Sequence, residues 1–459
     1  MGTDERPIAA IATALSPAAI AVIRVSGHDS VELLARRFSR PAVLREASGH
    51  SIHHGMIRDA SDRPLDEVLV AVYRQPASYT GEEAAEVFCH GSPAGVRRVY
   101  GALLASGFAG AEPGEFTRRA FMNGKLDLTR AEAVNEVVRA QTAAAHALAL
   151  DRLAGSVELA VNRIRTDLIG VMASLAIQLD YPEEETGPVD VDRDALHGAG
   201  EQCRALASTY ARGRLYQDGA AVAIAGRTNA GKSSLFNRLL QHDRSIVSET
   251  HGTTRDYVEA LIDVAGVPVR LFDTAGLRVS GEAVEQEGIR RSNAVVAAAD
   301  LVLYVVDALA GLGPEDEDRL NAIRAATPAI CVLNKVDLAP SPGVESPASD
   351  SVPGPAVAVS ALTGAGIDLL NDAMLAILLS DREAVSGNTA VIDSERQRAL
   401  LVRAGDAVER AVESLDSRMP ADIVSIDVQE ALGAVGEITG EVASAEILDA
   451  MFGSFCVGK

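Results

Sequence analysis

The sequence predicts a multidomain fold in which an α+β domain precedes an all-α helical domain that is split by an inserted α/β domain. The length of 459 residues exceeds what one hydrophobic core organises, so several domains are expected. Strand-like and helix-like runs mix before residue 121, and an Ala/Leu-rich helical texture follows. Over residues 218–380 short β-rich runs alternate with helical patterns, and the helical texture then returns.

Residues 1–120 form the predicted α+β domain. The runs "AAIAVIRVSG", "LDEVLVAVYR" and "EAAEVFCHGS" are typical of strands, whereas "SVELLARRF" and "AGVRRVYGALLASG" have helical spacing. Residues 121–217 have apolar positions at helical spacing and few breakers, including one helix expected at about 195–216. Residues 381–459 resume this texture, so both segments are assigned to the helical domain.

Residues 218–380 form the predicted inserted domain. Its strand-like runs are "AAVAIAG", "PVRLFDTAG", "ADLVLYVVDA", "PAICVLNKVD" and "PAVAVSA", each followed by a loop and a helical pattern. This alternation indicates a parallel sheet covered by helices. The Pro/Ser-rich stretch at 339–355 predicts a flexible surface insertion.

The composition argues against several classes of protein. No apolar run approaches the roughly 18 residues of a membrane span, and the start "MGTDERPIAA" lacks the pattern of a secretion signal. The four cysteines lie far apart without a C-x-x-C pair, which argues against a zinc site or a disulfide framework. A reducing, cytoplasmic location without membrane attachment is therefore expected. The cysteines are Cys89, Cys203, Cys331 and Cys456.

The formal charge of −22 limits how this chain binds nucleic acid. Because binding through phosphates needs a basic face, RNA would have to contact a local patch or a partner protein. Of 42 basic residues only four are lysines: Lys125, Lys232, Lys335 and Lys459. They either survive by chance or stand where a compact, flexible ammonium is required.

The stretch "GRTNAGKSS" fits the phosphate-loop pattern G-x-x-x-x-G-K-[ST], with Gly226, Gly231, Lys232 and Ser233 in the fixed places. It follows a predicted strand and opens a predicted helix, which is the context that gives the pattern meaning. The glycines turn backbone N–H groups toward phosphate oxygens at a helix N-terminus. Lys232 reaches the β and γ phosphates, and the Ser233 hydroxyl binds Mg²⁺.

Two further motifs belong to the phosphate side of a nucleotide site. "GTTRD" supplies Thr253 and Thr254, one of which can close on Mg²⁺ when the γ-phosphate is present. "DTAG" ends a predicted strand, which places Asp273 near the metal and the Gly276 N–H near the γ-phosphate. Both motifs stand in the order that a GTPase domain requires.

Two more motifs belong to the base. "NKVD" offers Asn334 and Asp337 to guanine and lays Lys335 along the ring, and "SAL" at 360–362 completes the pocket. Five ordered elements predict a GTP-hydrolysing domain. The predicted GTP-binding residues are Asn229, Ala230, Gly231, Lys232, Ser233, Ser234, Ser248, Thr253, Thr254, Asp273, Thr274, Ala275, Gly276, Asn334, Lys335, Asp337, Ser360, Ala361 and Leu362.

The hydrolytic chemistry is expected to be unusual. Leu277 follows the DTAG glycine and cannot orient water as glutamine does in many small GTPases. The Asn229 carbonyl offers a ligand to a monovalent cation that could replace an arginine finger, and "SETHGTT" at 248–254 could supply further oxygens. Glu282, Glu285 and Glu287 follow; each is either functional or a solvated charge.

Beyond the GTPase motifs, the chain resembles the MnmE (TrmE) family of tRNA modification GTPases across almost its whole length. The resemblance rests on "VIRVSG", "SYTGEEAAEVFCHGS", "PGEFTRRAFMNGKLDL", "GRTNAGKSS" with "DTAGLR", and the terminal "FCVGK". It implies a folate-binding and dimerisation domain at 1–120, a helical domain at 121–217 and 381–459 that carries a C-terminal Cys-x-Gly-Lys motif, and a Ras-like P-loop G domain at 218–380.

The resemblance also implies an activity. Members are homodimers that join the FAD-dependent protein MnmG (GidA) in a heterotetramer and modify uridine at the tRNA wobble position. They install a carboxymethylaminomethyl or aminomethyl group at C5, with carbon from 5,10-methylene-tetrahydrofolate and nitrogen from glycine or ammonium; 5-formyl-tetrahydrofolate serves as an analogue. Their G domains pair around K⁺ to hydrolyse GTP.

The resemblance also implies functional roles for residues of this chain that match the motifs of the family. The implied K⁺ ligands are Asn229, Ser248, Thr250 and Thr253; the implied Mg²⁺ ligands are Ser233 and Thr254; and the implied folate ligands are Arg24, Glu86, Lys125 and Lys459. Glu285 aligns with the glutamate that positions the attacking water. Cys456 is a candidate reactive thiol, with a packing role as the alternative. The chain therefore ends in an expected active-site element.

The chain departs from the pattern of the family at two places. "ALSPAA" at 14–19 replaces a Gly/Arg-rich stretch of the folate contact, and Thr228 replaces the usual proline.

An Era-like ribosome or RNA assembly switch is the main alternative function, but the chain is acidic and has no basic appendage after the G domain. A scaffold that binds GTP without turnover would not need the complete set of motifs.

Overall fold

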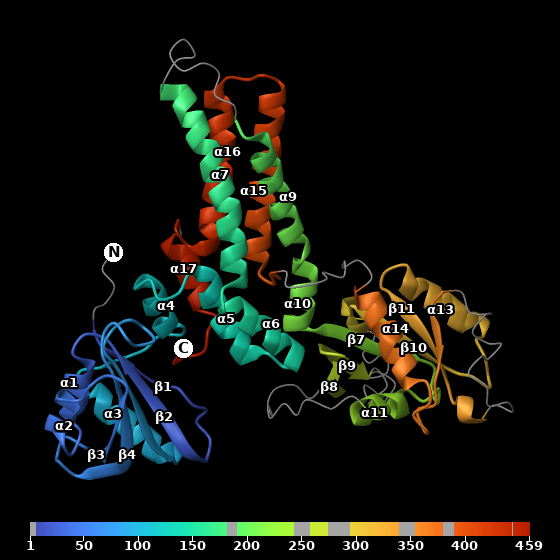
Figure 1. Ribbon diagram of the computed structural model, residues 1–459. Coiled ribbons are helices and arrows are strands. Elements are labelled where there is room, and N and C mark those ends of the chain that lie inside the picture. Colours follow the sequence, from blue (N-terminus) through green and yellow to red (C-terminus); the bar gives the residue numbers. More distant parts are fainter. Residues whose placement is uncertain are drawn as a thin grey trace. The chain divides into compact units, whose positions relative to one another are not determined.

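The computed structural model describes residues 6–180, 191–242, 258–273, 294–338, 354–379, 390–442 and 444–459 (Figure 1). Two compact units emerge from its contacts. The first comprises residues 1–138, 150–201 and 403–459, and the second comprises residues 139–149 and 202–402. Each is described by itself. The division at residues 120, 217 and 380 stays a prediction.

The first unit begins with a six-stranded sheet in the order β3-β4-β5-β2-β1-β6. Neighbouring strands are antiparallel except for β1 and β6. The strands are β1 (Ile8–Ile11), β2 (Ala18–Ser26), β3 (Ser51–Arg58), β4 (Pro64–Tyr73), β5 (Ala84–Gly91) and β6 (Ala109–Gly110). The mixture of strands and helices predicted for this segment is confirmed.

Three helices cover one face of this sheet: α1 (Ser30–Ala35), α2 (Pro41–Arg45) and α3 (Pro93–Leu104). Alternate strand residues such as Ile23, Val70 and Val87 are buried beneath them because side chains of a strand point to opposite faces in turn. The other face is open. Its residues include Ile20, Leu69 and Ile52, which are 60%, 45% and 65% exposed.

Long helices form the rest of the first unit. Helix α7 (Ser156–Asp180) lies along α16 (Ala421–Thr439) (Figure 1). The other helices of this unit are α4 (Glu115–Met122), α5 (Leu128–Arg139) and α17 (Ala445–Phe452). Helices α6 (Ala143–Leu153), α9 (Arg193–Ser208) and α15 (Glu395–Asp416) contribute residues to both units, and the last residue of α5, Arg139, belongs to the second unit. Because Arg152 and Glu136 are almost fully buried, their 2.5 Å ion pair ties α6 to α5 inside the core.

The second unit contains a six-stranded sheet in the order β12-β11-β10-β7-β9-β8. Only the β8–β9 pair is antiparallel. The strands are β7 (Ala220–Gly226), β8 (Val258–Val264), β9 (Val267–Asp273), β10 (Leu301–Asp307), β11 (Ala329–Asn334) and β12 (Ala356–Ala358). Strands β7, β10 and β11 are apolar along their length, since helices bury them from both sides.

Helices α11 (Lys232–His242) and α14 (Ile367–Leu379) pack on one face of this sheet, and α13 (Pro314–Arg324) packs on the other. A short 3₁₀ turn, η2 (Val336–Leu338), follows β11. The predicted alternation of strand and helix is confirmed. The parallel strands bring Gly226, Asp273, Asp307 and Asn334 to their carboxyl ends, which is the edge where open α/β sheets bind ligands.

The single helix expected at about 195–216 is wrong. The structure has two helices there, α9 and α10 (Tyr210–Asp218), with a break at Thr209. The Thr209 hydroxyl is buried; it donates to the Leu206 carbonyl (2.7 Å) and accepts from the Ile392 N–H (3.1 Å). Most of the predicted insertion at 339–355 lies outside the described residues. Within the described ranges, every helix is too short or too polar to cross a membrane.

Candidate functional site

The phosphate loop connects β7 to α11 in the second unit, and its geometry requires glycine at two places. Gly226 has a φ of 134°, and a Cβ there would collide with the Val305 carbonyl of β10. Gly231 has a φ of 96°, and a Cβ there would collide with the Asn334 side chain. Gly226 therefore lets the loop pass close to the backbone of β10, and Gly231 leaves room for the Asn334 side chain.

Lys232 and Ser233 start helix α11 next to this loop. The Lys232 ammonium is nearly buried and donates to the carbonyls of Gly226 (2.9 Å) and Arg227 (2.6 Å). The Ser233 hydroxyl donates to the Asp273 carboxylate at 2.8 Å. A hydroxyl and a carboxylate oxygen at a helix N-terminus are ligands of the kind that Mg²⁺ takes beside nucleotide phosphates.

Asn334 links the two ends of the nucleotide pocket. Its side-chain amide is 2% exposed and donates to the Ala230 carbonyl of the phosphate loop at 3.0 Å. Its side-chain carbonyl accepts from the Ala361 N–H, also at 3.0 Å. Asn334 thus fixes the phosphate loop and the 360–362 segment to one another. Its predicted contact with the base remains a prediction.

The remaining base motif is held by hydrogen bonds. The buried Ser360 hydroxyl donates to the Asp337 carboxylate (2.6 Å) and accepts from the Thr363 N–H (3.1 Å). This orients the carboxylate that is predicted to receive the guanine N–H groups. The Lys335 ammonium lies 2.7 Å from an Asp307 oxygen, and this hydrogen bond lowers the pKa of Asp307.

A network of charged and polar side chains that no sequence motif indicates supports the phosphate loop. The Arg227 guanidinium binds Asp316 (2.8 Å) and Glu315 (3.0 Å) in the first turn of α13. Asp316 is 3% exposed; it also accepts from the Tyr304 hydroxyl (2.9 Å) and the Gly313 N–H (3.1 Å). Burial, together with the Asp316 carboxylate, raises the pKa of Tyr304. The signal available was Arg227 itself, a long cation inside the phosphate loop.

The structure describes some of the other predicted nucleotide residues and leaves the rest outside its described ranges. Asn229 and Ser234 are exposed near the start of α11, and Asn229 has a φ of 67°. Ala361 is buried and Leu362 is 74% exposed. Several predicted residues lie outside the described ranges, namely Ser248, Thr250, Thr253, Thr254, Thr274, Ala275, Gly276 and Glu285.

A second cluster of predicted residues lies on the open sheet face of the first unit. Arg24 of β2 and Glu86 of β5 are paired across the strands, and the guanidinium donates to one carboxylate oxygen at 2.8 and 3.0 Å. The Tyr73 hydroxyl donates to the other oxygen at 3.4 Å. The Arg24 guanidinium also lies 5.7 Å from the Tyr79 ring and 5.8 Å from the Phe116 ring. Aromatic faces thus hold the cation in place.

The C-terminal segment returns to this cluster. The Gly458 carbonyl accepts from Arg24 at 3.2 Å, although the two residues are 434 positions apart. The Phe116 N–H donates to the Lys459 carbonyl (3.2 Å), and the Gly114 N–H donates to the Cys456 carbonyl (3.4 Å). Main-chain bonds therefore bring the last residues of the chain against β2 and the start of α4.

The side chains of this segment differ in exposure. Lys459 is half-buried, and burial, with the nearby Arg24 charge, lowers its pKa. Cys456 is exposed, whereas burial raises the pKa of each of the other three cysteines to about 11. Lys125 is exposed and donates to the Pro76 carbonyl at 3.1 Å.

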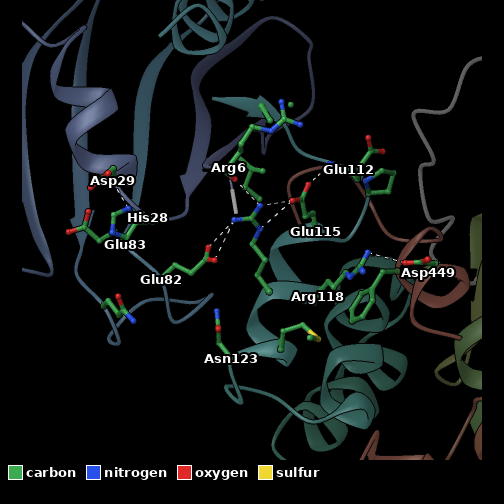
Figure 2. A pocket seen from close by; sticks show the side chains of 18 of the residues that line it. Arg6, His28, Asp29, Glu82, Glu83, Glu112, Glu115, Arg118, Asn123 and Asp449 are labelled. Atoms are coloured by element: carbon green, nitrogen blue, oxygen red, sulfur yellow. Dashed lines mark hydrogen bonds and ion pairs between the residues drawn. The ribbon is translucent and has the colours of Figure 1, made fainter. Parts of the chain in front are cut away.

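A cavity of about 1230 Å³ lies elsewhere in the first unit. Figure 2 shows Glu82 and Glu115 directed toward its centre. There Arg119 binds both carboxylates, at 3.3 and 2.7 Å. None of the four predicted folate residues lines it. Because its central cation is compensated by two carboxylates, we assign no ligand to this cavity.

The nucleotide site has the loop, the metal-side pair and the base motif of a P-loop GTPase, and that is the class of protein to which this chain belongs. Comparison with known proteins narrows the class. Residues 7–125 match the family model for the GTP-binding protein TrmE N-terminus, and residues 128–456 match the MnmE helical domain.

Curated relatives extend over nearly the whole chain. The tRNA modification GTPase MnmE of Treponema denticola is 42% identical over 99% of this chain and 98% of its own length. That of Geobacillus thermodenitrificans is 39% identical over 100% of both. A crystal structure of Aquifex aeolicus Era bound to GDP·AlF4⁻ is 27% identical over 41% of this chain and 66% of its own, with a TM-score of 0.29. The chain belongs to the MnmE family of tRNA modification GTPases.

The Arg227 network gives a prediction about GTP binding. In Asp316→Ala, the Arg227 guanidinium and the buried Tyr304 hydroxyl lose their shared acceptor, so the phosphate loop is no longer held against α13. GTP affinity should fall by about 5- to 30-fold, equivalent to roughly 1–2 kcal/mol. Glu315→Ala is the control, because Glu315 is 86% exposed, and it should change affinity less than twofold. Equal GTP dissociation constants for both variants, measured by titration, would contradict the assigned role.

Proposed function

We propose that this MnmE-family GTPase acts as a homodimer with an FAD-dependent partner of the MnmG type. Together they install a carboxymethylaminomethyl or aminomethyl group at C5 of the wobble uridine in tRNA. A folate one-carbon unit supplies the carbon. GTP hydrolysis that depends on K⁺ and on pairing of two G domains accompanies the reaction.

The observation that carries the folate part is the return of residues 456–459 to Arg24. Three of the four implied folate residues, Arg24, Glu86 and Lys459, belong to segments far apart in the sequence that meet at β2. Two cations against one carboxylate leave a positive balance that suits the glutamyl tail of a folate. Glu86, ordered by Arg24 and Tyr73, would accept hydrogen bonds from the pterin ring.

Cys456 would supply a thiol at the same place. It is the exposed cysteine of the chain, and its backbone is fixed to Gly114. A thiol held by main-chain bonds and open to solvent can approach a substrate carbon. The other three thiols are buried and remain protonated at neutral pH.

The nucleotide residues would act by positioning. Lys232 would hold the β and γ phosphates, and Ser233 with Thr254 would hold Mg²⁺, whose charge stabilises the phosphates during transfer. Asn229, which stands exposed at a positive φ in the phosphate loop, would bind K⁺ together with Ser248, Thr250 and Thr253. Glu285 would order the attacking water in place of the glutamine that Leu277 replaces.

The open sheet face supports a homodimer. Ile20, Leu69 and Ile52 are exposed on the same side of the sheet as Arg24 and Glu86. Apolar side chains gathered on one face are typical of a protein interface. A second copy bound there would cover the apolar residues and enclose the predicted folate residues.

The modification itself can be tested in cells. A strain of the source organism that lacks this gene should contain wobble uridine without the C5 group. Nucleoside analysis of its tRNA by mass spectrometry provides the measurement, and a plasmid copy of the gene serves as the control. Unchanged modification in the deletion strain would contradict the proposed function.

The cation requirement can be tested with purified protein. Because Leu277 cannot position water, GTP turnover should require K⁺ and should rise by about 10³-fold over turnover in Na⁺, near the lower value for an arginine finger. Asn229→Ala should abolish this difference while GTP is still bound. Equal turnover in the two salts would rule out a catalytic K⁺.

The folate site can be separated from the GTP site by truncation. Deleting residues 456–459 removes the Arg24–Gly458 bond and the Lys459 ammonium, so folate affinity should fall by about 10- to 150-fold. GTP binding should be unchanged, because its residues lie within 226–362. Cys456→Ser should keep folate affinity and lose tRNA modification. Unchanged folate affinity in the truncated protein, measured by titration with 5-formyl-tetrahydrofolate, would show that the segment does not bind folate.

A further inference from the structure

The helical layer of the N-terminal sheet has a charge opposite to that of the whole chain. Residues 30–46 and 93–104, which contain α1, α2 and α3, carry six arginines and two glutamates, a net charge of +4. The whole chain carries −22, so the remainder carries −26. A polyanion is therefore repelled by most of this protein but attracted to this layer.

These arginines face solvent. Val31, Leu34, Val96 and Val99 of the same helices are buried against the sheet, which leaves the opposite side of each helix outward. The exposed arginines of the layer are Arg36, Arg40, Arg45, Arg97 and Arg98, and Arg37 is half-buried.

Carboxylates within the layer neutralise little of this charge. The Glu32 carboxylate forms ion pairs with two arginines, at 2.7 Å from Arg45 and at 3.8 Å from Arg36. Among the described residues, none forms an ion pair or a side-chain hydrogen bond with Arg40, Arg97 or Arg98. By contrast, Arg58 and Arg63 of the neighbouring β3–β4 turn each have an aspartate partner, Asp62 and Asp59.

We propose that this arginine layer binds the phosphodiester backbone of tRNA. Guanidinium groups bind phosphates through paired N–H donors, and each contact releases counterions from the RNA. Such contacts position RNA without reading its sequence. The layer lies on the face of the sheet opposite Arg24 and Glu86, so phosphate contacts and the predicted folate residues occupy different faces.

This inference rests on the tRNA substrate of the family and is independent of the folate and K⁺ proposals. The test uses the full-length chain and fluorescently labelled, unmodified tRNA in anisotropy titrations over a range of KCl. The variant is Arg97→Glu with Arg98→Glu. The control is Arg163→Glu with Arg204→Glu, two exposed arginines on α7 and α9 that change the net charge by the same amount.

The dissociation constant of the Arg97/Arg98 variant should rise by about 10- to 100-fold, and the salt slope should fall by about 1 to 2, because two phosphate contacts are lost. The control should change affinity less than about threefold, because Arg163 and Arg204 do not belong to the layer. GTP turnover without tRNA should match wild type in both variants and so report correct folding.

Three results would overturn the inference. Equal weakening in variant and control would mean that tRNA responds only to total charge. Wild-type affinity in the Arg97/Arg98 variant would exclude the layer as the RNA-binding surface. Wild-type tRNA affinity combined with a change in the oligomeric state of this variant would assign the layer to a protein interface.

Discussion

One buried amide, Asn334, sets the geometry of the nucleotide pocket. Its two polar atoms bond the phosphate loop and the 360–362 segment at 3.0 Å each. With no water to replace them, losing either bond would leave a buried polar group unsatisfied. The glycine at 231 follows from this arrangement, since any larger residue would displace the amide. The predicted phosphate-binding and base-binding segments are therefore tied together by a single side chain.

The four lysines illustrate how this chain distributes cations. Lys232 donates to two loop carbonyls and Lys335 pairs with Asp307. Lys459 is half-buried beside Arg24, while Lys125 is exposed. Arginine, by contrast, can direct two N–H groups at one carboxylate, as Arg24 does at a single oxygen of Glu86. Three of the four lysines thus lie at the two candidate sites, whereas Lys125 donates to the Pro76 carbonyl.

The nucleotide site could be predicted from the sequence because each of its motifs is a short, continuous stretch. The described parts of four motifs sit at or directly after the carboxyl ends of β7, β9, β11 and β12, so the fold brings these residues together once the strands are recognised. The role of Asp316 was not predicted, because this residue belongs to the acidic run "PEDED", which is typical of a solvent-exposed helix start. Its burial follows from Tyr304 and Arg227, which are distant in sequence.

The cluster around Arg24 could be predicted only from the resemblance to the family. Arg24, Glu86 and Lys459 share no local pattern, and strand pairing together with the returning segment unites them. The break at Thr209 was not predicted either, because the helical pattern across α9 and α10 is continuous in the sequence. The Arg24 cluster depends on tertiary contacts, which local patterns do not encode.

The contact between Arg24 and Gly458 also has a consequence for protein synthesis. Ribosomes translate about 5–20 residues each second and N-terminal domains generally fold first, so the strands that carry Arg24 and Glu86 emerge tens of seconds before residue 458 exists. During that interval a nascent chain holds a folded but incomplete cluster, with the Gly458 acceptor of Arg24 still missing. This cluster can therefore assemble only after the last residues have been translated. By contrast, every residue of the nucleotide site that the structure describes has been translated once the ribosome has passed residue 363.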